Sequence, residues 1–180
     1  TAFDSSDNLL DAELMEYLEG DPEWWLDGKI DNALDFNNEI KQFAKVVGYE
    51  NESNALTISA WVLARSAESW GTVLKNWGDT KSGHFHFGLN SSGELSNFIG
   101  TSNGKTYSAT EKQKFPINSW QHIATTVDGL SIKLYRNGEL VAENRYQGTL
   151  IENDLSSIGI GAKLNDDGTW VSQSAGGYWN

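Results

Sequence analysis

Several residue types are absent or scarce in this chain, and each absence excludes something. No cysteine occurs among the 180 residues, so the chain forms no disulfide and carries no thiol chemistry. No apolar run is long enough to form a membrane-spanning helix. Only 2 prolines stand against 18 glycines, which suits short strands joined by turns.

Basic residues are also few. The chain has 13 Lys and Arg against 25 Asp and Glu, a net charge of −12 and a pI of about 4.5. Such a surface cannot neutralise a row of phosphates, which excludes nucleic acid as a partner. It equally disfavours anionic membrane surfaces, and insertion into a membrane is not expected. The simplest role of the acidic surface is therefore to keep the protein soluble.

Tryptophan, by contrast, is abundant. Eight tryptophans are more than one hydrophobic core usually needs. For any one of them, packing in the core or at an edge is the simpler interpretation. A surface on which sugar rings stack is the functional one.

Alternating patterns predict strands. In residues 54–65, the side chains of 56, 58, 60 and 62 are apolar and share a face. In 84–90, Phe85 and Phe87 share one face, and His84 and His86 the other. Residues 132–142 form two strands around Asn137-Gly138, a pair typical of a type I′ turn. We expect further strands at 70–77, 93–100, 106–115 (an edge), 119–129 and 156–164.

The fold class predicted is all-β, a two-sheet antiparallel sandwich forming one domain over residues 1–180. The segment "DAELMEYLEG" (11–20) contains helix formers and a glycine stop. We therefore expect a short helical or irregular N-terminal arm.

The order of motifs resembles that of a known family. The segments are "GKIDNALDFN", "LTISAWV", "GTVLKNWGD", "WQHIATTVDG", "IKLYRNGELVA", "SSIGIGAK" and "GGYWN". Together they resemble the LamG-like jelly-roll family of the concanavalin A-like lectin/glucanase group. The resemblance implies two antiparallel sheets and an extracellular or cell-surface protein.

The two ends depart from that family. Members open with an additional apolar strand and continue past "YWN" with a further strand, and in the family these two strands pair. Here the chain begins at Thr1 and ends at Asn180. Three explanations stay open: a fragment of a longer chain, strands supplied by another chain, or a repurposed N-terminal arm. The fragment is favoured.

Catalytic signatures are weak. Glucanases of this group need two carboxylates on one strand face, and no Glu-x-Asp-x-x-Glu motif occurs. The acidic run at 152–157 reads as a turn before a strand. His122 lacks the spacing found in lyases and is interpreted as structural. We expect no enzyme activity.

Calcium is the one cofactor expected, because it prefers carboxylate, amide and carbonyl oxygens. The candidate ligands are Asp79 and the run Asn165, Asp166 and Asp167, although ordinary turn chemistry explains the same residues. A second constellation joins residues 3–8 to Asp35 and Asn37. A zinc ion at His84 and His86 is not expected, because no third ligand is evident.

The candidate ligand-binding residues are aromatic or imidazole side chains in or beside loops: Trp77, His84, His86, Trp170 and Tyr178. Trp179 is expected in the core. If the Trp77 loop and the 165–179 loop share a rim, they would form a sugar site with calcium nearby.

Three functions follow in order. The first is a carbohydrate-binding module of a larger extracellular protein, calcium-dependent if the metal is bound. The second is a protein-interaction or spacer domain of an adhesin, without a glycan site. The third is a polysaccharide-degrading enzyme. Another chain or segment that completes the sandwich is a further expected partner.

Overall fold

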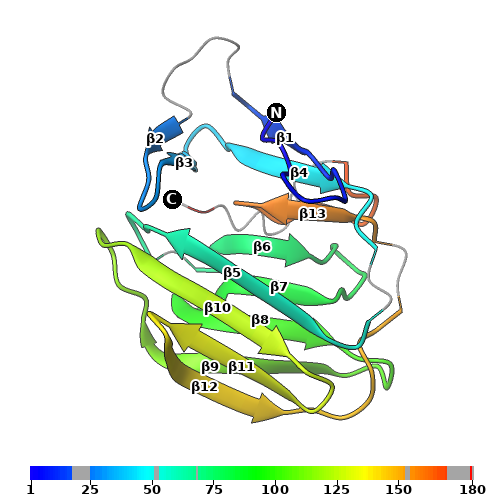
Figure 1. The fold of residues 1–180 in the computed structure, drawn as a ribbon. Helices are drawn as coiled ribbons and strands as arrows, with labels where there is room; N and C mark the ends of the chain where they lie inside the picture. Colours follow the sequence, from blue (N-terminus) through cyan, green and yellow to red (C-terminus); the bar gives the residue numbers. More distant parts are fainter. Residues whose placement is uncertain (18–24, 51–52, 68, 153–154, 170–178, 180) are drawn as a thin grey trace.

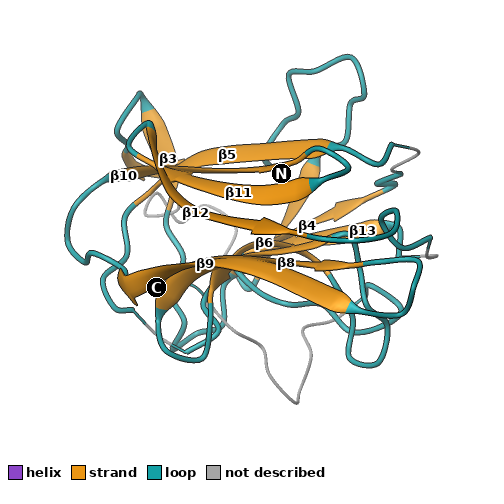
Figure 2. Cartoon of the chain, turned by 90° about the horizontal axis from the view of Figure 1, so that it is seen from below, coloured by secondary structure: helices purple, strands orange, loops and turns teal. Residues whose placement is uncertain are grey.

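The predicted β-sandwich is confirmed by a computed structural model of the chain. It describes residues 1–17, 25–50, 53–67, 69–152, 155–169 and 179. Two antiparallel sheets face each other, and no helix occurs in these ranges (Figures 1 and 2). No helix of this part of the chain is long and apolar enough to cross a membrane.

The larger sheet has seven strands in the order β1-β4-β13-β6-β7-β8-β9. Their bounds are β1 Ala12–Met15, β4 Phe43–Val47, β6 Thr72–Asn76, β7 Phe85–Leu89, β8 Glu94–Gly100, β9 Thr106–Lys114 and β13 Ser157–Ile160. The smaller sheet has four strands in the order β12-β11-β10-β5. These are β5 Leu56–Val62, β10 Gln121–Val127, β11 Ser131–Arg136 and β12 Glu139–Arg145. A separate hairpin joins β2 Trp25–Asp27 to β3 Asn32–Leu34.

The core lies between the two main sheets. Strands β7 and β10 each alternate, so every second side chain points inward. Phe87 and Leu89 of β7 are essentially inaccessible, as is Ile123 of β10. They belong to one continuous cluster. The predicted inner face of β5 packs against the same cluster, and β9 lies at the sheet edge as expected.

The Asn137-Gly138 turn has the predicted conformation. Both residues have positive φ, 52° and 86° respectively, as a type I′ turn requires. The Asn137 side chain also accepts a hydrogen bond from the backbone N–H of His122 at 2.9 Å. A register shift between Leu134 and Tyr135 then places a bulge in the β11–β12 pair.

The expected helical arm is wrong over Ala12–Met15. This segment is strand β1, paired antiparallel with β4. Helix propensity is a weak preference that tertiary pairing overrides. Here Ala12 is buried in a small cluster with Ala44 and Val46 of β4, so pairing and burial decide the conformation.

The two layers differ in width, and this shapes one side of the molecule. Strands β12 and β11 lie over β9 and β8. At the other side the smaller sheet ends at β5, whereas the larger sheet continues through β13 and β4 to β1. No strand of the described ranges pairs with the outer edge of β5. The β2–β3 hairpin stands near that edge (Figure 1).

Candidate functional site

Two hollows lie on the described surface. The larger, about 460 Å³, runs between β5 and the β2–β3 hairpin; we name it the β5 groove. The smaller, about 250 Å³, lies beside Trp77; we name it the Trp77 hollow. They differ in chemistry.

In the Trp77 hollow, Trp77 meets residues 165–168, part of the 165–179 loop that the expected sugar site requires on the same rim. Trp77, half-buried, follows β6, and the loop from Asn165 to Gly168 follows β13. Strand β6 also supplies Lys75, and β13 supplies Ser157. The remaining lining residues are Lys81, Leu155, Ser156, Leu164, Asp166 and Asp167.

Asp166 fastens the two loops together. Its carboxylate accepts hydrogen bonds from the Thr80 N–H at 2.9 Å, the Thr80 hydroxyl at 2.5 Å and the Lys81 N–H at 3.1 Å. These bonds, the Thr80 hydroxyl first, lower the pKa of Asp166 to about 2. The loop approaches so closely that a Cβ on Gly78 would stand 2.0 Å from an Asp166 oxygen. Gly78 is therefore required for this junction.

The other acidic candidates are likewise engaged. Asp167 accepts from the N–H and the hydroxyl of Thr169, at 2.9 and 2.5 Å. Asp79 forms an ion pair with Lys163 at 2.8 Å. In the described ranges, no three His, Asp or Glu side chains gather as metal ligands.

This donor set does not fit calcium as it stands, because N–H, hydroxyl and ammonium groups already occupy the carboxylates of Asp166, Asp167 and Asp79. A calcium ion would have to displace them. Calcium at Asp79 and residues 165–167 stays a prediction.

Lys75 is the unusual residue of this hollow. It is only 8% exposed, and its Nζ lies 3.0 Å from Nδ1 of His86 on the neighbouring strand. Burial, and then the positive charge of Lys163, lower the pKa of Lys75 to about 7. Asp79 acts in the opposite direction. The surroundings of Lys75 therefore do little to stabilise its protonated form.

The two candidate histidines are buried rather than presented to solvent. His84 is 6% and His86 4% exposed. His84 Nε2 lies 2.8 Å from the carbonyl oxygen of Ile151, and Trp70 covers His86 with ring centroids 5.6 Å apart. Neither lines either of these two hollows, and their role in ligand binding stays a prediction. Trp170 and Tyr178 lie outside the described residues.

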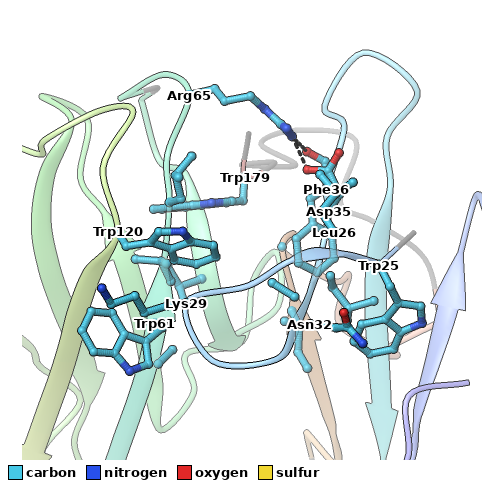
Figure 3. Close-up of a pocket in the computed structure, with 18 of the residues that line it drawn as sticks. Trp25, Leu26, Lys29, Asn32, Asp35, Phe36, Trp61, Arg65, Trp120 and Trp179 are labelled. Carbon is cyan, nitrogen blue, oxygen red and sulfur yellow. Dashed lines mark hydrogen bonds and ion pairs between the residues drawn. The ribbon is translucent and has the colours of Figure 1, made fainter. Parts of the chain in front are cut away.

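The β5 groove gathers four tryptophans that the sequence had not grouped: Trp25, Trp61, Trp120 and Trp179. Figure 3 shows Lys29 of the hairpin beside Trp61, with Nζ 5.5 Å from the ring centroid. At the rim, Arg65 forms an ion pair with Asp35 at 2.5 Å. Trp179 is 8% exposed, in agreement with its expected core position.

Apolar residues dominate the groove, and several remain exposed: Trp25 and Leu26 by 45%, Ile30 by 68% and Trp61 by 39%. The floor is formed by Val73 of β6 and Ile160 of β13. Sequence reasoning missed this site because five strands contribute to it. The sequence feature that could have pointed to this groove is the Trp24-Trp25 pair next to a polar arm.

Comparison with known proteins identifies the superfamily of the chain. The profile of the concanavalin A-like lectin/glucanases superfamily matches residues 36–173, so the chain belongs to this superfamily. No curated protein sequence matches significantly.

Similar solved structures are binding domains. Domain 4 of AbnA, an extracellular arabinanase from Geobacillus stearothermophilus, was solved with arabinotriose. It is 21% identical at a TM-score of 0.61, covering 79% of this chain and 67% of its own. The binding domain of Paraclostridial Mosquitocidal Protein 1 is 20% identical at a TM-score of 0.70, covering 92% of this chain.

A third similar structure is the CBM40 domain of a Ruminococcus gnavus IT-sialidase, solved with α2,3 sialyllactose. It is 18% identical at a TM-score of 0.51 and covers 61% of this chain. The present chain spans 64% of that domain and 42% of the mosquitocidal one. At these identities the likeness shows the fold alone.

Proposed function

We propose that this chain is a non-catalytic carbohydrate-binding module and that the Trp77 hollow is its sugar site. The observation that carries the proposal is the meeting of Trp77 with the 165–168 loop in one hollow. A sugar site needs an apolar platform for C–H groups and a few fixed polar groups for hydroxyls. The hollow supplies both.

Each group has a definite role in this proposal. Trp77 is the platform on which a sugar ring stacks. Ser156 and Ser157 also line the hollow and supply hydroxyls that donate or accept. Asp167, held ionised by its hydrogen bonds, accepts from sugar hydroxyls. The Asp166–Thr80 junction fixes the shape of the site before the ligand arrives.

The relatives support this proposal in general terms. One was solved with arabinotriose and another with sialyllactose, and both are parts of enzymes that act on glycans. The arabinanase is extracellular. We infer a similar place for this chain, as a module of an extracellular or cell-surface protein.

A non-catalytic role agrees with the state of the carboxylates. Glycoside hydrolysis needs one carboxyl group with a raised pKa as the acid. In the hollow, the pKa values of Asp166 and Asp167 are both lowered. Neither is suited to donate a proton at neutral pH.

The test is a glycan array followed by calorimetry on the glycans retained. Trp77→Ala should weaken binding by more than about tenfold. Trp61→Ala, the same truncation in the β5 groove, is the matched control and should bind like wild type. An EDTA arm tests the predicted calcium, since a ligated metal would make affinity fall on chelation. Loss of binding in Trp61→Ala alone would move the site to the groove.

The second candidate function is capture of an extended peptide segment in the β5 groove. Backbone groups on the outer edge of β5 face no strand of the described ranges, and such an edge is a template for strand addition. Exposed Leu26 and Ile30 offer apolar cover for alternate side chains of the added strand. This favours the interaction-module alternative.

A displayed random-peptide library tests this second function. Retained peptides should protect the amides of Leu56–Val62 from hydrogen exchange. Ile30→Glu should abolish retention by placing a charge in the groove, whereas Leu140→Glu is the control, because Leu140 is 52% exposed on distant β12. No retained peptides, or exchange in β5 that is unchanged by them, would contradict strand capture.

A further inference from the structure

Lys75 is a buried lysine that forms no ion pair in the described ranges. A buried charge is normally compensated by an opposite charge. The hydrogen-bond partner of Lys75 is instead the imidazole of His86. Since an ammonium group only donates, His86 Nδ1 accepts, and the ring proton lies on Nε2. That Nε2 is buried and has no partner in the described ranges.

The other charged groups near Lys75 have partners of their own. Asp79 lies within 2.8 Å of Lys163, and Asp166 is saturated by donors from Thr80 and Lys81. On the same sheet, Lys45 forms an ion pair with Glu13 at 3.1 Å. Lys75, unlike Lys45 and Lys163, forms no ion pair in the described ranges, and the attraction of Asp79 offsets its burial only in part.

Lys75 lies where a ligand can reach it. It lines the Trp77 hollow together with Trp77 and Lys81. An anionic group entering the hollow would meet an ammonium already stripped of much of its water. Little further desolvation is then required, and a charge-assisted hydrogen bond is stronger than a neutral one.

We propose that the Trp77 hollow is specific for a sugar that carries a carboxylate, and that Lys75 binds this carboxylate. The inference rests on the proposed carbohydrate-binding function and names its ligand class. One buried lysine without an ion pair matches one carboxylate. The ring stacks on Trp77, and its hydroxyls meet Asp167. The charges of Asp166 and Asp167 repel a second negative charge.

Two sugar classes carry such a carboxylate, and two matched probe pairs distinguish them. One pair is an oligogalacturonide and the same oligosaccharide with its carboxylates reduced to alcohols. The other is sialyllactose and lactose. Calorimetry is performed on wild type, Lys75→Met, Trp77→Ala and Lys133→Met. The last removes a lysine of the opposite sheet, where Lys133 pairs with Asp128.

We expect the acidic member of one pair to bind wild type at least about tenfold more tightly than its neutral counterpart. Lys75→Met should erase that preference and retain the neutral affinity, whereas Trp77→Ala should lose both and Lys133→Met neither. Equal affinity for acidic and neutral members, unchanged in Lys75→Met, would overturn the carboxylate proposal and leave the module intact. No binding of any saccharide would overturn both.

Discussion

Lys75 occupies a position that costs the protein stability. Its pKa falls from an ordinary value of 10.5 to about 7, so the folded protein resists protonating it. The cost is nearly absent above the ordinary value and grows as pH falls towards 7. A residue held at such a cost is typical of a binding site.

Lys75→Met should therefore stabilise the unliganded protein. We expect a gain on the order of 2–4 kcal/mol near neutral pH and a much smaller one near pH of about 10. Urea denaturation at the two pH values measures it. A variant less stable than wild type at neutral pH would mean that Lys75 has a stabilising partner.

The ionised carboxylate of Asp166, by contrast, stabilises the fold. Its pKa is lowered from 3.8 to about 2, so its ionised form stabilises the fold above the ordinary value. This contribution is lost as pH falls towards 2. Asp166→Asn should lower Tm at neutral pH, and the difference from wild type should shrink as the solution is acidified. A difference that does not depend on pH would show that the carboxylate charge is not what holds Thr80.

At the scale of elements, alternation predicted most strands because each buries one face. It could not predict the N-terminal arm, where the helix formers of 12–15 pair with β4 as a strand. It also placed His84 and His86 on a polar face. The sequence does not show what covers the outer face of a sheet, and here Trp70 covers His86.

The β11–β12 hairpin yields a prediction at this scale. Gly138 has φ 86°, and a Cβ there would meet nothing within 4 Å. The cost of Gly138→Ala is thus backbone strain alone, about 1 kcal/mol. Urea denaturation should show this loss, whereas Leu140→Ala, at an exposed position, should change little. Equal stability of Gly138→Ala and wild type would contradict the type I′ turn.

At the scale of the whole molecule, the unequal sheets separate two surfaces. The Trp77 hollow lies over β6 and β13, and the β5 groove opens at the free edge of the smaller sheet. For the first, the sequence and the family resemblance indicated Trp77 and residues 165–167, and left open whether their loops share a rim. Sequence reasoning missed the second, since no single segment carries the pattern of a groove built from β2, β3, β5, β6 and β13.

The central claim is that a saccharide stacks on Trp77. The most direct measurement is the NMR signal of the indole N–H groups, which report on the 8 tryptophans separately. Titration with a glycan retained on the array should shift the Trp77 signal, assigned with Trp77→Phe, and leave those of Trp25 and Trp61 in place. Shifts confined to Trp25 and Trp61, or no shift at a saturating concentration, would contradict the account.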